Sequence, residues 1–157
     1  MSVYGWSVAE VHYHPEFVRQ LEDLASKAES DHWLLELFGE VMALLRALED
    51  HGHDIEGYQP EDASHPIVTS RFRTFALRRT PPTAHTPYAE DPPILRIPYV
   101  WFDRPDGSEV AVVMLIGDKT QRGRDWYPWA VRQIEDTMIG QWHRRHPDHR
   151  AQVKRTR

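Results

Sequence analysis

The feature that most restricts the fold is a change in hydrophobic period along the chain. Between Pro15 and His53, apolar side chains recur every three or four positions, which is the spacing of an amphipathic helix. Between Ile67 and Ile116 they occur in short β-branched and aromatic runs separated by Pro and Gly, which is typical of strands. A chain of 157 residues has the length of one ordinary domain. The sequence therefore predicts a single domain that packs helices against a sheet.

Two helices are predicted in the first third of the chain, and they form a hairpin. The first begins at Pro15, because proline has no N–H to leave unbonded at the first helical position, and it extends to Ala28. The second is capped by Ser30 or Asp31 and ends at Gly52, which suits the left-handed conformation after a helix.

Four strands are predicted around this hairpin. Val3–Tyr13 alternates between apolar and polar residues, and Ile67–Arg79 and Ile94–Phe102 are rich in β-branched and aromatic residues. Val110–Ile116 is continuously apolar, which predicts a central strand buried on both faces. Pro98 has no N–H to donate, so its strand is expected at a sheet edge or at a bulge.

The last predicted element is a helix that begins near Asp125 or Pro128 and is limited by Pro147. The proline-rich stretch 80–93 is expected to be a loop. We predict an α+β domain over residues 1–147, with the N-terminal strand and helical hairpin packed on a small, mostly antiparallel sheet and a helix at the C-terminal end. Residues 148–157 are predicted to be a basic, flexible tail.

Composition narrows the class of protein. There is no Cys, which excludes disulfides, thiolate metal sites and a Cys nucleophile. No run of about 18 apolar residues is present and the first residues do not have the pattern of a secretory signal, so we expect a cytoplasmic protein that does not contact a membrane. The net charge of −5 argues at first against a nucleic-acid partner.

This total conceals two halves of opposite charge. Residues 1–66 hold 3 Lys or Arg against 14 Asp or Glu, a net charge of −11. Residues 67–157 hold 16 basic residues against 10 acidic ones, a net charge of +6. A basic face is an electrostatic footprint for phosphate groups, although the same charges also suit an ordinary solvated surface.

Four short stretches, taken in order, resemble motifs of one protein family. They are LRALEDHGHD at 45–54, FALR at 75–78, LRIPY at 95–99 and MLIGDKTQ at 114–121. Together with the order of predicted elements, they resemble the RelE/ParE toxin superfamily, and within it the HigB-like branch.

The resemblance implies the toxin of a type II toxin–antitoxin system. It would be an endoribonuclease that cleaves mRNA, usually on the ribosome, without a metal or other cofactor. The ribose 2′-OH would attack the adjacent phosphate, which requires cations at the phosphorus and groups that move protons. The implied protein partner is an antitoxin with a helix-turn-helix DNA-binding domain.

The motifs assign candidate site residues by their positions. Arg78 and Arg96 would be neighbours on adjacent strands, with an anion between the two guanidinium groups. Lys119 would be a third cation, and Tyr99 would transfer a proton. The candidate RNA-binding residues are Arg71, Arg73, Arg122, Arg124, Trp126 and Tyr127, in which arginines follow the backbone and aromatic rings stack on bases.

Structural interpretations of these residues remain open. Arg78 and Arg96 also suit ion pairs with the acidic helices. Trp126 has the spacing of a core residue, and Tyr99 suits packing within a strand. The sequence also has Ala76 where the family commonly has Glu, and Asp118 where it commonly has Lys. These departures leave two alternatives: a ParE-like protein that inhibits gyrase without cutting RNA, and a relative that is no longer toxic.

Histidine is abundant, with 10 residues. His12 and His14 share a face of a predicted strand, and His143 and His146 share a face of the closing helix. Either pair suits Zn²⁺ or Ni²⁺, but neither has a visible third ligand. No metal site is therefore assigned.

Overall fold

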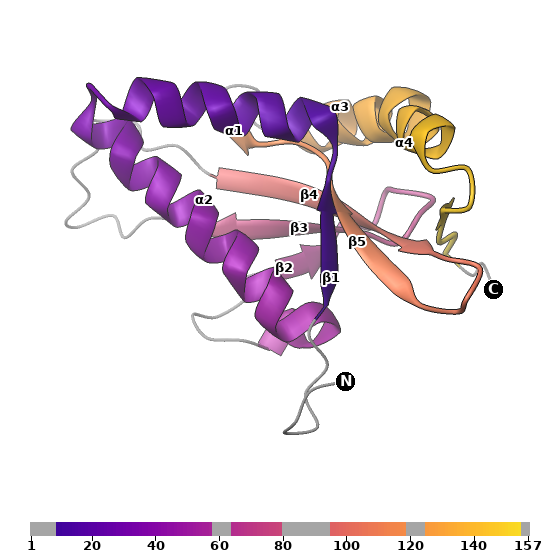
Figure 1. The fold of residues 1–157 in the computed structure, drawn as a ribbon. Coiled ribbons are helices and arrows are strands. Elements are labelled where there is room, and N and C mark those ends of the chain that lie inside the picture. Colours follow the sequence, from indigo (N-terminus) through magenta and orange to yellow (C-terminus); the bar gives the residue numbers. More distant parts are fainter. Residues whose placement is uncertain (1–8, 58–63, 80–94, 119–124, 155–157) are drawn as a thin grey trace.

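The structure is a computed structural model that describes residues 9–57, 64–79, 95–118 and 125–154 (Figure 1). One strand and a pair of helices come first, most of the strands follow, and the remaining helices lie near the C-terminal end. In order, the elements are β1 (Glu10–Tyr13), α1 (Pro15–Ala28), α2 (His32–His51), the 3-10 helix η1 (Gly52–Gly57), β2 (Ser64–Pro66), β3 (Thr74–Arg79), β4 (Leu95–Asp103), β5 (Glu109–Val113), β6 (Gly117–Asp118), α3 (Trp126–Gln133), the π-helical segment η4 (Ile134–Met138), α4 (Ile139–Arg145) and β7 (Arg150–Ala151).

The strands form one sheet in the order β1-β5-β4-β3-β2, and β6 and β7 also pair with β4. β1 is parallel to β5, and the other pairs are antiparallel. The helical hairpin α1–α2 covers one face of the sheet, and α3, η4 and α4 pack on the other face (Figure 1). The predicted α+β fold of helices packed on a mostly antiparallel sheet is therefore confirmed.

The hairpin begins and ends where its capping residues predict. α1 starts at Pro15. The Asp31 carboxylate accepts a hydrogen bond from the N–H of Trp33 at 3.0 Å, so Asp31 rather than Ser30 caps α2. α2 ends at Gly52, where φ is 53°, a conformation that residues with a Cβ rarely adopt.

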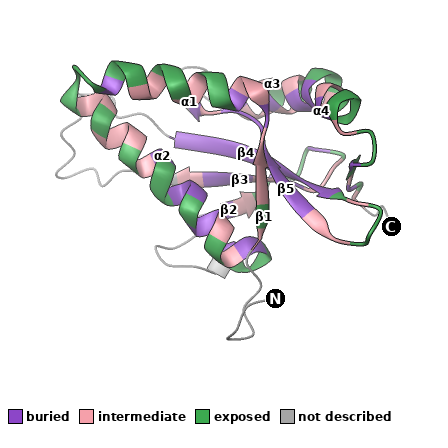
Figure 2. Ribbon diagram, viewed as in Figure 1, coloured by how far each residue is buried: buried purple, intermediate pink, exposed green. Residues whose placement is uncertain are grey.

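The apolar run in β5 lies between two cores, as predicted. Ala111 and Val113 contact the core under the helical hairpin, whereas Val110 and Val112 contact the core under α3 and α4. All four side chains are fully buried, and Figure 2 shows the burial concentrated in the middle strands. β5 and β4 therefore form the centre of the domain.

Pro98 does not lie in an edge strand, so that alternative is wrong. β4 is central, with β3 on one side and β5 on the other. The alternative of a bulge agrees with the register, because residues 114–116 stand opposite residues 97–98 between the pairs Tyr99↔Val113 and Arg96↔Gly117. The ladder is thus interrupted next to Pro98, where its missing N–H costs no pairing.

The bounds of the predicted strands differ from those in the structure. Within the strand predicted at Val3–Tyr13, the described part contains β1 at Glu10–Tyr13, and residues 3–8 lie outside the described residues. The strand predicted at Val110–Ile116 ends at Val113. The strand predicted from Ile67 begins at Thr74, because the N–H of Ser70 bonds to the carbonyl of Ile67 and turns the chain there. The predicted loop 80–93 is also outside the described residues.

The predicted flexible tail is packed over most of its length, so this prediction needs correction. Arg150–Ala151 forms β7 and pairs with β4, and Gln152 is buried. The Lys154 ammonium donates to the carbonyls of Ile67 and Val68. A strand of two residues is too short to show a hydrophobic period in the sequence. The prediction of a flexible tail therefore depended on the basic composition of this segment alone.

Among the residues that the structure describes, none of the helices combines the length and apolar character needed to cross a lipid bilayer.

Candidate functional site

Arg78 and Arg96 are direct neighbours across β3 and β4, as predicted. Arg96 is almost buried, with 7% of its surface exposed. Its Nε donates to the hydroxyl of Tyr127 on α3 at 3.1 Å, and its Nη1 donates to the carbonyl of Leu95 at 2.8 Å. Because a strand alternates its side chains, the paired Arg78 lies on the same side, facing away from the helical hairpin.

His65 joins this group and was not found from the sequence. It stands opposite Ala76 in the β2–β3 pair, so it shares the face of Arg78 and Arg96. Its Nε2 lies 3.1 Å from the Tyr127 hydroxyl. His65 lies in a strand of three residues, which is too short to show the two-residue period of a strand in the sequence. We call Arg78, Arg96, Tyr127 and His65 the paired-arginine site.

Tyr99 does not belong to the paired-arginine site, which corrects its predicted role. It lies three positions after Arg96, so it points to the opposite face, and its ring is 1% exposed in the core under the helical hairpin. Its hydroxyl is 2.7 Å from Oγ of Ser64. The alternative interpretation of Tyr99 as a packing residue is the one that fits.

Trp126 is also a core residue. It is 2% exposed and packs in the core under α3 and α4, so it cannot stack on an RNA base in this conformation. Tyr127, the next residue, contacts the Trp126 ring edge-to-face at 5.0 Å and is half-buried. Of the two aromatic residues predicted to bind RNA, only Tyr127 reaches the paired-arginine site.

Of the other predicted cations, the structure describes Arg71 and Arg73, and both are bound to side chains outside the paired-arginine site. Arg71 is bound to Glu135, with Nε and Oε1 3.0 Å apart. Burial opposes ionisation of Glu135, but hydrogen bonds from Arg71 and Ser70 hold its pKa below the usual range. Arg73 donates to Gln152 at 2.7 Å and lines a pocket with Tyr99 on the hairpin face. Lys119, Arg122 and Arg124 lie outside the described residues.

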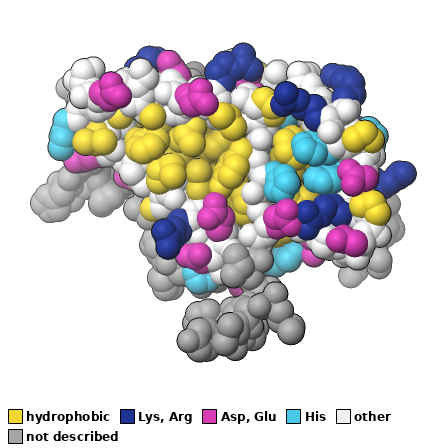
Figure 3. All heavy atoms as spheres, viewed as in Figure 1, with side chains coloured by type: hydrophobic (Ala, Val, Ile, Leu, Met, Phe, Trp, Pro, Cys, Tyr) yellow, Lys and Arg dark blue, Asp and Glu magenta, His cyan; other side chains and the backbone are white. Residues whose placement is uncertain are grey.

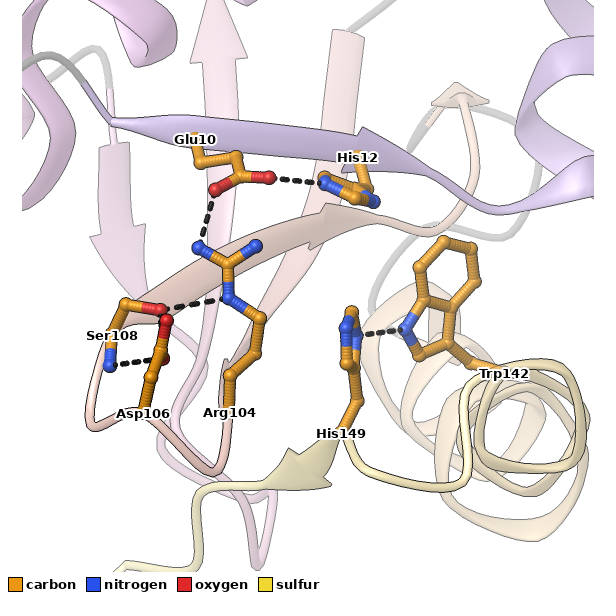
Figure 4. A network of polar contacts seen from close by, with 7 residues as sticks. All are labelled: Glu10, His12, Arg104, Asp106, Ser108, Trp142 and His149. Atoms are coloured by element: carbon orange, nitrogen blue, oxygen red, sulfur yellow. Dashed lines mark hydrogen bonds and ion pairs between the residues drawn. The ribbon is translucent and has the colours of Figure 1, made fainter.

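A second polar cluster lies where β1 meets the turn between β4 and β5 (Figure 4). The Glu10 carboxylate binds the guanidinium of Arg104 and lies 2.9 Å from Nε2 of His12. These hydrogen bonds, first that of Arg104 and then that of His12, lower the pKa of Glu10 to about 2. Arg104 also donates from Nε to Oγ of Ser108 at 2.8 Å.

The rings of His12, His146 and His149 lie close to Trp142, next to this cluster, and Figure 4 shows His12 and His149 beside it. The indole N–H of Trp142 donates to Nδ1 of His149 at 3.1 Å, and the ring of His146 stacks on Trp142 at 4.1 Å. His12 lies 6.0 Å from His149 between ring centroids. Within the described ranges, no three His, Cys, Asp or Glu side chains are arranged to hold a metal ion. The cluster therefore packs the end of α4 against β1.

No family model, curated protein or solved structure matches this chain. Any functional conclusion must therefore come from the chemistry of the residues themselves.

Proposed function

We propose that this protein is the toxin of a type II toxin–antitoxin system and cleaves mRNA as a metal-independent endoribonuclease. The observation that carries the proposal is the direct pairing of Arg78 and Arg96 on neighbouring strands. Two cations at cross-strand neighbouring positions repel each other, and an anion bound by both would relieve this repulsion. A guanidinium suits a phosphate because its N–H groups form a planar fork.

The reaction requires one attack and two proton movements. The 2′-oxygen bonds to the adjacent phosphorus, the bond from phosphorus to the 5′-oxygen breaks, and the products are a 2′,3′-cyclic phosphate and a 5′-OH. Arg78 and Arg96 would stabilise the negative charge that develops on the phosphate oxygens. Arg96 uses two of its five N–H groups to donate to Tyr127 and Leu95, and in this proposal phosphate oxygens accept from the other groups.

Tyr127 and His65 take the proton-transfer roles in this proposal, in place of Tyr99. A guanidinium only donates, so the Tyr127 oxygen accepts from Arg96 and its own proton can pass toward Nε2 of His65. An imidazole is well suited to accept and return a proton near neutral pH. One of these groups would take the proton of the 2′-OH and the other would protonate the 5′-oxygen.

The proposal includes the partners and the compartment that go with such a toxin. An antitoxin with a helix-turn-helix DNA-binding domain would hold the protein inactive in the cytoplasm. The substrate would be mRNA on the ribosome. RNA binding would depend on the local basic face, because the net charge of −5 gives no general attraction to a polyanion.

One observation favours a second candidate, a binding protein on the same scaffold that blocks gyrase without cutting RNA. Arg96 is 7% exposed and its bonds to Tyr127 and Leu95 already hold it in place, which is the environment of a structural arginine. A relative without toxicity would have the same environment. The experiment must therefore measure RNA cleavage as well as growth arrest, because a toxic protein that does not cut RNA also arrests growth.

The test is inducible expression in bacteria with primer extension on abundant messages. A nuclease produces new 5′ ends within minutes of induction, together with growth arrest. Growth arrest with intact messages would support the gyrase-inhibitor alternative. The absence of both growth arrest and new 5′ ends would support the non-toxic alternative.

Single substitutions Arg78→Ala and Arg96→Ala should remove both the new ends and the growth arrest. Arg132→Ala is the matched control, since Arg132 is exposed on α3 and lies outside the paired-arginine site. Cleavage that is unchanged in both site variants would overturn the assignment of the site.

A further inference from the structure

The helical hairpin α1–α2 exposes an apolar surface to solvent. Five large hydrophobic side chains are exposed among the described residues, and three of them lie on this hairpin: Val18 at 38%, Leu35 at 52% and Met42 at 43%. Figure 3, viewed as in Figure 1, shows that hydrophobic side chains form one continuous area between the two helices. Isolated apolar side chains are normal on a protein surface, but a continuous area marks an interaction site.

The spacing of residues along each helix explains this surface. On both helices the apolar residues extend beyond the side that faces the core, again at intervals of three and four residues, so each helix has a wide apolar stripe. The two helices form a hairpin, so these parts of the stripes lie side by side (Figures 1 and 3). We call the following residues the hairpin surface: Val18, Leu21 and Ala25 on α1, and Leu35, Phe38 and Met42 on α2.

The edge of the hairpin surface is acidic. Residues 15–51 hold nine acidic residues against three Lys or Arg, a net charge of −6. All three cations make ion pairs inside the hairpin, which are Arg19 with Glu16, Lys27 with Asp23 and Arg46 with Asp50. Glu22 and Glu29 follow Val18 and Ala25 by four residues, so they lie beside them on α1. Both are exposed and make no ion pair with the described residues, and Figure 3 shows Asp and Glu side chains along both edges of the apolar area.

We infer that the hairpin surface binds a basic amphipathic helix of a partner protein. The apolar side chains of that helix would cover the hairpin surface, and its Lys or Arg side chains would pair with the acidic edge. Charge complementarity of this kind selects a basic partner and suppresses acidic ones.

The backbone of the hairpin favours a helix over an extended segment. The surface consists of helix side chains, and the N–H and C=O groups beneath them are bonded within α1 and α2. An extended segment buried there would leave its own backbone groups without partners, whereas a helix bonds them internally. α1 has 14 residues and a length of about 21 Å, so a partner helix of similar length matches it.

The same charges oppose two other occupants. A second copy of this chain would bring another hairpin with a net charge of −6, and a nucleic acid is also negative, so both would be repelled. The hairpin covers the face of the sheet opposite to the paired-arginine site. A helix bound to the hairpin surface therefore leaves that site open, and the inference does not rest on the proposed function.

Fluorescence anisotropy with labelled peptides and the full chain tests the inference. The probe is a peptide of 14 leucine and lysine residues, with the leucines spaced three and four apart so that they form one side of a helix. One control peptide has glutamate in place of lysine, and the other has the same composition in a scrambled order without an apolar side. At about 0.15 M salt, we expect the probe to bind at least tenfold more tightly than either control.

Two exposed positions assign the binding to the hairpin surface. The double substitution Leu35→Gln/Met42→Gln should weaken binding of the probe at least tenfold. Because both side chains are largely exposed, the variant should keep its fold, which thermal unfolding checks. The matched control is Val68→Gln/Val153→Gln, at exposed apolar residues outside the hairpin, and it should bind like the wild type.

The acidic edge is tested separately. Glu22→Gln/Glu29→Gln should weaken binding at least threefold and reduce its dependence on salt, because two of the charges that attract the probe are removed. Asp125→Asn/Asp136→Asn, at exposed acidic residues outside the hairpin, is the matched control and should leave binding unchanged.

Sedimentation of the protein without peptide tests the second copy as the occupant. We expect a monomer, and a dimer that Leu35→Gln/Met42→Gln converts to a monomer would show that another copy covers the surface. Three binding results would also overturn the inference: equal affinity for the probe and its two controls, wild-type affinity in the Leu35/Met42 variant, and equal loss in the Val68/Val153 variant. None of these results depends on whether the protein cleaves RNA.

Discussion

The hydroxyl of Tyr127 accepts a hydrogen bond from Nε of Arg96 at 3.1 Å, and this contact joins the helix α3 to the central strand β4. Tyr127 lies at the start of α3, directly after Trp126, which is buried under the same helix. The core position of Trp126 therefore fixes where the Tyr127 hydroxyl meets the sheet. Any function of Arg96 must operate with this hydroxyl beside it.

Tyr127→Phe separates a proton-transfer role from a packing role. The ring keeps its contact with Trp126, but the hydroxyl no longer accepts from the charged Arg96 or contacts His65. We therefore expect the free energy of unfolding to fall by about 1.5–3 kcal/mol. Cleavage should slow by about 10²-fold or more if the hydroxyl moves a proton. The measurement is single-turnover cleavage of an RNA substrate, with thermal unfolding in parallel. An unchanged cleavage rate would remove Tyr127 from the proposed mechanism.

Tyr99→Phe should have the opposite outcome. The Tyr99 hydroxyl is buried beside Oγ of Ser64 at 2.7 Å on the hairpin side of the sheet, away from Arg96. We expect a loss of about 1 kcal/mol in unfolding free energy and no change in growth arrest or cleavage. Ser64→Ala is the companion variant and should cost a similar amount. Loss of activity in a well-folded Tyr99→Phe protein would return Tyr99 to the site.

The sequence predicted elements whose signals are local. The α1–α2 hairpin follows from Pro15, Asp31 and Gly52, and the central place of β5 follows from its apolar run. The pairing of Arg78 with Arg96 was expected from the resemblance of the two strand motifs to a family, and the register of β3 and β4 agrees with it.

The parts that failed depend on side-chain direction or on contacts between distant residues. Tyr99 lies three positions from Arg96, and the two-residue period of a strand already places such positions on opposite faces. His65 and Tyr127 meet from positions 62 apart in the chain, and no local pattern connects them. β7 consists of two residues held by β4, so its order comes entirely from tertiary pairing.

Gly117→Ala should destabilise the domain by about 1–3 kcal/mol, the usual cost of overfilling a packed core. A Cβ at Gly117 would lie 2.1 Å from Cζ2 of Trp126, so the indole ring or β6 must move. Trp126 is buried and has little space to move. Denaturant unfolding measures the change.

Gly140→Ala is the matched control for this substitution. Gly140 lies inside α4, and a Cβ there would meet nothing within 4 Å. Replacing a helical Gly by Ala should stabilise the protein by up to about 1 kcal/mol. Equal effects of the two substitutions would contradict the close packing of Trp126 against Gly117.

The stability of the fold should decrease as the pH falls below neutrality. Burial lowers the pKa of His149, and the neighbouring His146 acts in the same direction. In the unfolded chain this His has a pKa of about 6.5, so as the pH falls the unfolded state takes up the proton before the folded state does. Between the two pKa values the unfolded state binds more protons, so stability is full above the unfolded pKa and is lost as the pH falls toward the folded one.

His149→Asn should reduce this pH dependence, because Asn does not titrate and its side-chain oxygen can still accept from Nε1 of Trp142. We expect the drop in melting temperature between pH 7.5 and pH 5.5 to become smaller by about 2–4 °C. Part of the slope should remain, since burial also lowers the pKa of His14. His32→Asn, at an exposed site on α2, is the control. An identical slope in His149→Asn and the wild type would show that His149 does not contribute to the loss of stability in acid.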